Sequence, residues 1–148
     1  MKALIQRVKN ASVTVDGQTI GHIDAGVLAY IGIGHGDDLA TAKKLIDKIL
    51  GYRIFANEHG KLDLNVQQVG GGLLLVSQFT LMARTDKGRR PDFTDAMPPD
   101  DAKALFAELV DYAESQYAEY GQVATGEFGA NMQVSAVNDG PLNFLLEV

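Results

Sequence analysis

The feature that most constrains the fold of this 148-residue chain is an apolar run, Leu73–Leu81, which follows three consecutive glycines. A half-exposed strand carries apolar residues at every second position, because successive side chains point to opposite faces of the sheet. This run is apolar on both faces. It is therefore predicted to be a central strand that is buried on both sides.

Short segments with alternating apolar or β-branched residues predict further strands around this run. They are residues 3–8, 11–15, 19–23, 27–33, 52–56 and 62–66, and three more strands are expected after residue 121. Residues 39–50 have helical spacing instead, follow an acidic residue at Asp38 and end at Gly51. A second helix is predicted to begin at Pro99 and to end before Gly121.

These segments together predict one α/β domain over residues 1–148. We expect a large, twisted, mixed β-sheet, partly barrel-like, packed by two main helices. A chain of this length can bury one sizeable core.

The composition narrows the class of protein. Hydrophobic residues make up 46% of the chain and charged residues 22%, which is ordinary for a water-soluble domain. No run of 18 apolar residues predicts a membrane span, and Gln6 and Arg7 interrupt the first apolar stretch too early for a signal peptide. The chain has no cysteine, so it has no disulfide and no thiol nucleophile. We expect a cytoplasmic protein.

The formal net charge of −6 argues against broad, nonspecific binding to nucleic acid, which requires a basic face. One dense basic segment, residues 84–90, contains Arg84, Lys87, Arg89 and Arg90. A solvated loop and a local phosphate-binding patch both remain open for this segment.

Two possible cofactor signals do not hold. The glycines at 32, 34 and 36 precede a predicted helix, but Asp37 occupies the place of the third glycine of a dinucleotide-binding fingerprint. The three histidines, His22, His35 and His59, lie beside glycines and lack the i, i+4 spacing of a helical metal pair. They are predicted to be surface residues, and no metal or other cofactor is expected.

Two hydroxyl groups, those of Ser77 and Thr80, lie near the end of the predicted central strand. A nucleophilic hydroxyl needs a base within hydrogen-bond reach, and no base is near in sequence. The chain also has no G-x-S-x-G elbow. From the residues alone, a structural role and a chemical role for these hydroxyls are equally favoured.

Two motifs change this balance. Ser77–Leu81 reads S-Q-F-T-L and Asn138–Pro141 reads N-D-G-P, and in this order they resemble the D-aminoacyl-tRNA deacylases, which remove D-amino acids from mischarged tRNA. The resemblance extends over the whole chain, including Ala3–Val8, Leu50–Phe55, Leu64–Gln68 and Met132–Val134. The family's second motif usually continues Val-Thr, where this chain has Leu142 and Asn143. That departure leaves the geometry after Pro141 open.

The resemblance implies a homodimer in which the cis Gly140–Pro141 pair of one subunit enters the pocket of the other. The backbone of this pair would reject an L side chain and admit D-residues and glycine. The implied activity is therefore hydrolysis of the ester of D-aminoacyl-tRNA and glycyl-tRNA. The tRNA itself would assist through its terminal 2′-hydroxyl.

The resemblance and the chemistry of the residues together suggest roles for three sets of residues. The catalytic motif comprises Ser77, Gln78, Phe79 and Thr80; substrate binding is expected from Gly140, Pro141, Met132 and Arg7; contacts to tRNA phosphates are expected from Arg84, Lys87, Arg89 and Arg90. Two alternatives remain: a non-enzymatic module that binds an amino-acid-like ligand, and an esterase that uses Thr80 as nucleophile.

Overall fold

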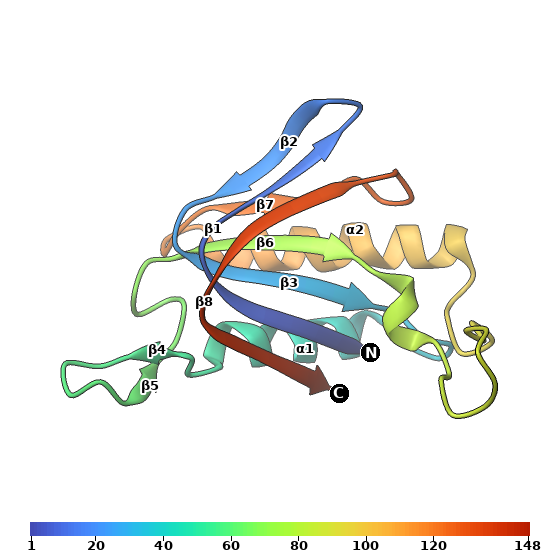
Figure 1. Cartoon of the computed structure of the whole chain (residues 1–148), viewed down its shortest axis with the longest axis horizontal. Helices are drawn as coiled ribbons and strands as arrows, with labels where there is room; N and C mark the ends of the chain where they lie inside the picture. Colours follow the sequence, from blue (N-terminus) through green and yellow to red (C-terminus); the bar gives the residue numbers. More distant parts are fainter.

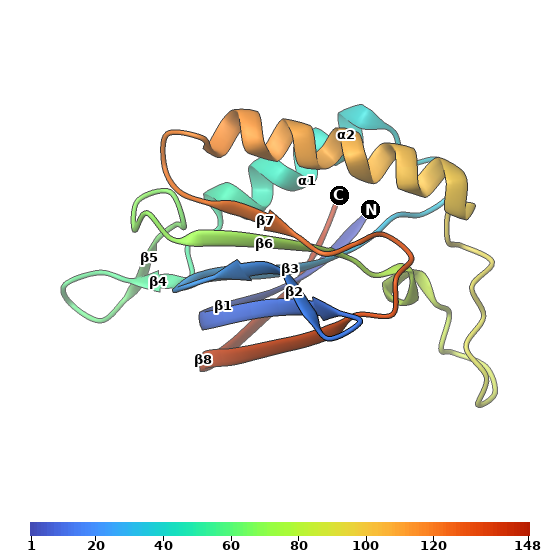
Figure 2. The same ribbon diagram turned by 90° about the horizontal axis from the view of Figure 1, so that it is seen from above.

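Strand β6 (Gly72–Ser77) lies inside the sheet and runs parallel to β3 (Gly26–Gly32) on one side and to β7 (Val123–Thr125) on the other. The structure, a computed structural model, describes all 148 residues. The sheet has the strand order β2-β1-β3-β6-β7, and β8 pairs with β1. It curls toward a nearly closed barrel, and both helices cover the same side of it (Figure 1; Figure 2).

The remaining elements follow the chain order. They are β1 (Lys2–Val15), β2 (Gln18–Ile23), α1 (Leu39–Gly51), β4 (Phe55–Ala56), β5 (Leu62–Leu64), the 3-10 helix η1 (Phe79–Met82), α2 (Pro99–Tyr117) and β8 (Gln133–Glu147). Strands β4 and β5 form a separate two-stranded hairpin that projects from the body (Figure 1).

Strand β6 is buried on both faces, as its sequence predicts. Leu73 and Leu75 belong to a core of 22 residues that lies between the sheet and the helices. Leu74 and Val76 point the other way, into a core of seven residues inside the curl of the sheet. All four side chains are at most 1% exposed. One strand therefore joins two hydrophobic cores.

Glycines allow the strands to approach closely where the sheet curls. Gly26 and Gly72 face each other at the start of the β3–β6 pairing, and a Cβ on Gly26 would overlap the backbone of Gly72. At the open seam of the barrel, a Cβ on Gly21 of β2 would overlap the carbonyl oxygen of Thr125 in β7. Strands β2 and β7 therefore approach each other this closely only because residue 21 has no side chain.

Helix α1 begins where the acidic residues predict it. Asp38 is the N-cap and accepts a hydrogen bond from the Thr41 amide at 2.8 Å, and bonds from Thr41 lower the pKa of the Asp38 carboxyl. Asp37 has another role, because its carboxylate accepts bonds from the Met1 ammonium group at 2.8 Å and from the Gly34 amide at 2.7 Å. It fixes the turn between β3 and α1.

Several strand predictions differ from the structure. The predicted strands 3–8 and 11–15 are one strand, β1, because β8 pairs with both parts of it, and the predicted strand 62–66 stops at Leu64. The predicted strand 73–81 ends at Ser77, because β3 ends at Gly32 and leaves no partner for the following residues, which form η1. The predicted strand 52–56 is reduced to Phe55–Ala56, which pairs only with the short β5. The last two predicted strands are one strand, β8, because β1 pairs with it on both sides of Gly140 and Pro141.

No helix of the chain combines the length and the apolar character that a membrane crossing requires.

Tyr117 of α2 provides a test of how the helix is attached to the segment that precedes β6. Its side chain is fully buried, burial raises the pKa of its phenol to about 12, and its hydroxyl donates to the carbonyl oxygens of Val66 at 3.0 Å and Gly71 at 2.7 Å. Tyr117→Phe leaves both carbonyls without this donor, so it should lower the free energy of unfolding by about 1–3 kcal/mol.

The measurement is urea unfolding followed by circular dichroism. Tyr120→Phe is the matched control, because the Tyr120 side chain is 49% exposed and its hydroxyl makes no hydrogen bond within the chain. Equal midpoints for the two variants would contradict the attachment role of Tyr117.

Candidate functional site

A cavity of about 780 Å³ opens at the carboxyl end of β6. Three residues of the S-Q-F-T-L motif, Ser77, Gln78 and Phe79, line it, and Met132 lies on its wall. The remaining wall comes from the end of β3, from residues 93–99 before α2 and from the loop that leads into β8. The cavity is mostly apolar, with a few polar groups, which is typical of a small-ligand site.

The motif changes conformation at the rim of this cavity. Ser77 is the last residue paired with β3, opposite Ile31, and the Gln78 amide donates to the Ile31 carbonyl at 2.7 Å. The first helical bond of η1 runs from the Leu81 amide to the Gln78 carbonyl. The amides of Phe79 and Thr80 therefore have no acceptor within the helix. Phe79 lines the cavity, whereas Thr80 is exposed but does not line it.

The Thr80 hydroxyl is not activated by a base. Its hydrogen-bond partner is the side-chain amide of Gln78, which donates to it at 2.7 Å. An amide cannot accept the proton that a hydroxyl nucleophile must lose. Thr80 is exposed, and this arrangement gives it no triad.

The Gly140–Pro141 pair does not line the cavity of its own chain. The peptide bond is cis, as the resemblance implies, and both residues are exposed in β8. Neighbouring Asn138 pairs with Val8, which pairs with Gly26 at the start of β3, whereas Ser77 pairs with Ile31 near its end. Five residues of strand, about 16 Å, thus separate the two motifs along the sheet.

Arg7 of β1 holds the segment before Gly140. Its guanidinium donates to the carbonyl oxygens of Asp139 at 3.2 Å and Ile54 at 2.8 Å, and it pairs with the Asp139 carboxylate at 3.1 Å. The Asn138 side-chain amide donates to the Arg7 carbonyl at 2.9 Å and to the Leu142 carbonyl at 3.2 Å. Two side chains thus fix the backbone on both sides of the Gly-Pro pair.

Asn143, which departs from the family pattern, faces β1. Its side-chain oxygen accepts a hydrogen bond of 2.8 Å from the Gln6 side-chain amide, and the two residues are paired in the β1–β8 ladder. This contact is an exposed cross-strand bond, so Asn143 supports the pairing of the strands beside the Gly-Pro pair.

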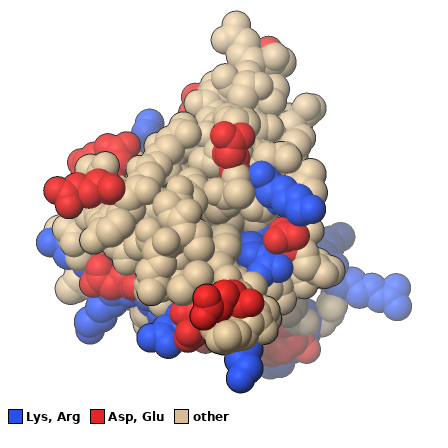
Figure 3. All heavy atoms as spheres, turned by 90° about the vertical axis from the view of Figure 1, so that its left-hand side faces the viewer, with Lys and Arg blue, Asp and Glu red and all other residues tan.

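The four basic residues of the 84–90 segment do not share one environment. Arg84 makes two bonds of 2.6 Å to the Asp95 carboxylate and is therefore engaged within the loop. Lys87, Arg89 and Arg90 are exposed and form no ion pair within the chain. Elsewhere the charges are mixed: Figure 3 shows acidic and basic side chains intermingled on one end of the molecule.

The cavity also brings together residues that the motifs did not indicate. Tyr30 of β3 lies on its wall, and burial raises the pKa of its phenol. Phe93 and His35 also line it. The alternation of β3 places Tyr30 on the same face as Leu28, so its position could be predicted from the sequence, whereas the position of Phe93 in a loop could not.

All three histidines are exposed, as predicted.

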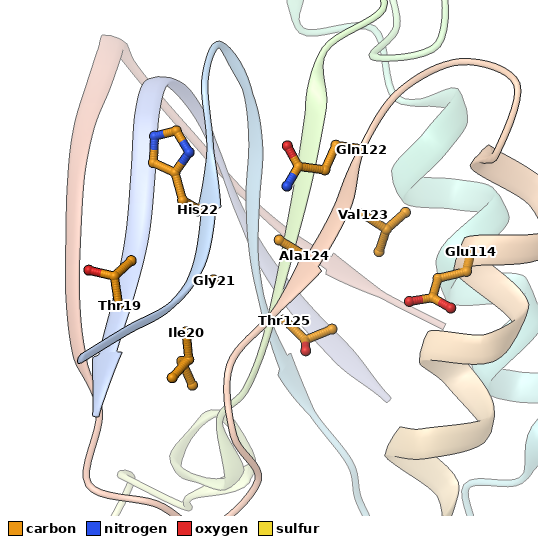
Figure 4. A pocket seen from close by; sticks show the side chains of 9 residues that line it. All are labelled: Thr19, Ile20, Gly21, His22, Glu114, Gln122, Val123, Ala124 and Thr125. Carbon is orange, nitrogen blue, oxygen red and sulfur yellow. The ribbon is translucent and has the colours of Figure 1, made fainter. Parts of the chain in front are cut away.

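A second cavity, of about 390 Å³, lies at the seam between β2 and β7. Figure 4 shows its side chains coming from β2 on one side and from the β7 segment on the other, with Glu114 of α2 beyond β7 and away from His22. It contains none of the motif residues. We therefore assign the chemistry to the larger cavity.

The chain is similar to proteins of one family over its length. The sequence profile described as D-Tyr-tRNA(Tyr) deacylase matches residues 4–147. The D-aminoacyl-tRNA deacylase of Psychrobacter cryohalolentis is 69% identical over 153 residues, covering 100% of this chain and 99% of its own. The D-aminoacyl-tRNA deacylase of Acinetobacter baumannii is 61% identical over 148 residues with the same coverage.

Two solved structures share the fold. The c-Myc DNA unwinding element binding protein has a TM-score of 0.93 and 39% identity, covering 100% of this chain and 99% of its own. A probable eukaryotic D-amino acid tRNA deacylase has a TM-score of 0.86 at 14% identity, covering 99% and 98%, and this likeness concerns the fold alone.

The contacts of Arg7 lead to a stability prediction. Arg7→Met removes the donors to two carbonyl oxygens, so hydrogen exchange at residues 138–142 should rise at least tenfold. The measurement is hydrogen exchange read by mass spectrometry of peptides that cover β8. Lys9→Met is the control, because Lys9 lies on the same strand and is exposed. Unchanged protection in Arg7→Met would show that the guanidinium does not hold this segment.

Proposed function

Since the chain belongs to the D-Tyr-tRNA(Tyr) deacylase family, we propose that it hydrolyses the ester bond of D-aminoacyl-tRNA and of glycyl-tRNA and spares L-aminoacyl-tRNA. The observation that carries the proposal is the placement of the two motifs. Ser77, Gln78 and Phe79 line a ligand-sized cavity, and the Gly140–Pro141 backbone is presented at the surface, outside the cavity of its own chain.

This placement favours a homodimer as the working unit. Strand β8 pairs only with β1, so its other edge is free, and its apolar residues Val137 and Leu145 are 49% and 55% exposed. A second copy that covers this surface could insert its Gly140–Pro141 pair into the cavity of the first. Each cavity would then be completed by backbone from the partner subunit.

The proposed selection acts on chirality by exclusion. If the α-amino group and the ester are both fixed, only two directions remain at Cα, one for hydrogen and one for the side chain. An L side chain would point into the backbone of Gly140 and Pro141, and a D side chain would point toward solvent. The site then needs no contact with the D side chain, so it accepts many D-residues and also glycine.

The proposed chemistry uses positioning and not a protein nucleophile. The amides of Phe79 and Thr80 are suited to bind the ester carbonyl oxygen as it gains negative charge. Water attacks the carbonyl carbon, the ester C–O bond breaks, and the products are the free amino acid and the tRNA with its terminal hydroxyl restored. The neighbouring 2′-hydroxyl of the ribose assists this step within the pocket. Met132 forms the pocket wall, Gln78 orients the terminal adenosine, and Arg7 holds the Gly-Pro segment.

A direct test uses three substrates. The chain is incubated with matched D- and L-aminoacyl-tRNA and with a simple D-aminoacyl ester, and release of the amino acid is followed. D-aminoacyl-tRNA should be hydrolysed at least a hundredfold faster than the other two, because the L side chain is excluded and the simple ester lacks the ribose hydroxyl. Glycyl-tRNA should be hydrolysed as well.

The other outcomes separate the alternatives. Release from none of the substrates would indicate a module that only binds an amino-acid-like ligand. Equal release from the simple ester and the tRNA would indicate that the protein supplies the nucleophile. Equal release from D- and L-aminoacyl-tRNA would contradict the proposed chiral filter.

Substitution of Thr80 tests whether the protein or the RNA supplies the hydroxyl group that takes part in the reaction. Thr80→Ala should retain single-turnover deacylation within about tenfold of the unaltered chain, because its hydroxyl faces only the Gln78 amide. Thr80→Ser serves as the control, since it keeps the hydroxyl and loses only the methyl group. Activity retained in the serine variant and abolished in the alanine variant would establish Thr80 as the nucleophile and contradict the proposal.

A further inference from the structure

The Gly140–Pro141 pair lies in a bulge of β8 that faces a single residue of β1. The β1–β8 ladder is interrupted between positions 6 and 8 of β1, so residues 139–142 stand opposite Arg7 alone. Both Gly140 and Pro141 are exposed, and no side chain of the chain donates to their carbonyl oxygens. The bulge therefore presents two carbonyl groups to a ligand.

Arg7 brings a positive charge to this bulge. A Cβ on Gly140 would lie 3.3 Å from Arg7 Nη2, and Arg7 Nε donates to the Asp139 carbonyl at 3.2 Å. The Arg7 side chain is only 15% exposed, so water and salt screen its charge less than that of a surface residue. The guanidinium is a suitable donor to carbonyl oxygens, but its charge disfavours any cation that approaches the same backbone.

The Asp139 carboxylate balances this charge. Its Oδ2 atom lies 3.1 Å from Arg7 Nε, and it is the one carboxylate that forms an ion pair with Arg7. The other groups that Arg7 binds are the carbonyl oxygens of Ile54 and Asp139, which carry no net charge. Because the ion pair as a whole is close to neutral, the partial negative charges of the two open carbonyl groups are free to attract a cation.

We propose that Asp139 is a specificity-determining residue. Its carboxylate balances the charge of Arg7 and thereby allows the carbonyl groups of Gly140 and Pro141 to accept a cation, the α-ammonium group of an aminoacyl ester. The identity of the ligand rests on the proposed function. Asp139 acts through Arg7 and is not a catalytic residue. A ligand with the same ester and configuration, but with a hydroxyl in place of the amine, gains nothing from this balance.

The test compares KM for two substrates in the unaltered chain and in Asp139→Asn. One substrate is a D-aminoacyl-tRNA, and the other is the D-2-hydroxyacyl-tRNA with the same side chain. The ratio of the two KM values reports the charge, because the RNA and the ester are the same, and an assay at about pH 6 keeps the amine protonated. Asp139→Asn should raise KM for the aminoacyl substrate about tenfold, with kcat within about twofold, and leave KM for the hydroxyacyl substrate unchanged.

Two further variants show whether Asp139 acts through Arg7. Asp139→Glu keeps the charge, so its KM ratio should stay within about threefold of that of the unaltered chain. The double variant Arg7→Met/Asp139→Asn removes both charges. Both of its KM values should rise, because the bulge loses its support, but their ratio should return toward that of the unaltered chain. A ratio that stays at the Asp139→Asn value would show that the carboxylate acts on the ammonium group directly, and would overturn the role through Arg7.

Glu108→Gln is the matched control, because Glu108 is exposed on α2 and the substitution changes the net charge of the chain equally. Hydrogen exchange at residues 138–142 should be unchanged in Asp139→Asn, since the bonds from Arg7 to carbonyl oxygens remain and an amide oxygen replaces a carboxylate oxygen. An equal rise in KM for both substrates, with faster exchange, would show a purely structural role and overturn the proposal. Unchanged KM values for both substrates would overturn it as well.

Binding separates this proposal from the proposed function. The probes are two adenosine derivatives with an amide in place of the ester, one D-aminoacyl and one D-2-hydroxyacyl, and their binding is measured by calorimetry. Tighter binding of the aminoacyl probe that is lost in Asp139→Asn, without hydrolysis of D-aminoacyl-tRNA, supports the charge balance and contradicts the deacylase. Hydrolysis with the same KM ratio in the unaltered chain and in Asp139→Asn leaves the deacylase intact and overturns the charge balance. If neither hydrolysis nor binding occurs, both proposals fail.

Discussion

The burial of β6 on both faces is the constraint on which the rest of the structure depends. Leu73 and Leu75 require the two helices on one side, and Leu74 and Val76 require the curl of the sheet on the other. A flat sheet with helices on one face would leave the second pair in water, at a cost of about 1.5–3 kcal/mol for each side chain. The curl, and the glycines that permit it, follow from this requirement.

The same strand determines where the cavity lies. Its pairing ends at Ser77 because β3 ends at Gly32, and the chain then turns into η1 with two amides that have no helical acceptor. Polar backbone groups without partners remain only where water or a ligand can reach them. The backbone at the end of this strand, which is buried on both faces, is therefore open to a ligand.

The proposed chemistry relies on backbone groups at both motifs. Side chains such as Arg7, Asn138 and Gln78 act as supports that fix the main chain, through bonds to carbonyl oxygens or to a neighbouring hydroxyl. In the proposed mechanism the backbone selects by shape and rejects an L side chain at Cα whatever its chemistry. This arrangement suits a task in which many different D-residues must be accepted and all L-residues refused.

Much of the fold could be predicted from the sequence. Helix caps, alternating burial along strands and the burial of residues 73–76 on both faces all depend on local chemistry and composition. The bounds of α1 and α2 agree closely with the pattern. Local pattern did not reveal the end of β6, because that end depends on where a distant strand stops. It also read β8 as two strands, because continuous pairing with β1 overrides the turn signal of Gly140 and Pro141.

The sequence by itself determined the class of fold, the two motifs and the family they resemble. Only the tertiary structure decided that the motifs lie well apart along the sheet, that Arg84 is bound to Asp95, and that the rings of Phe93 and Phe79 pack together. The physical reason is the range of the interactions. Burial patterns and caps act within a few residues, whereas the positions of loops and strand ends are set by partners far away in the chain.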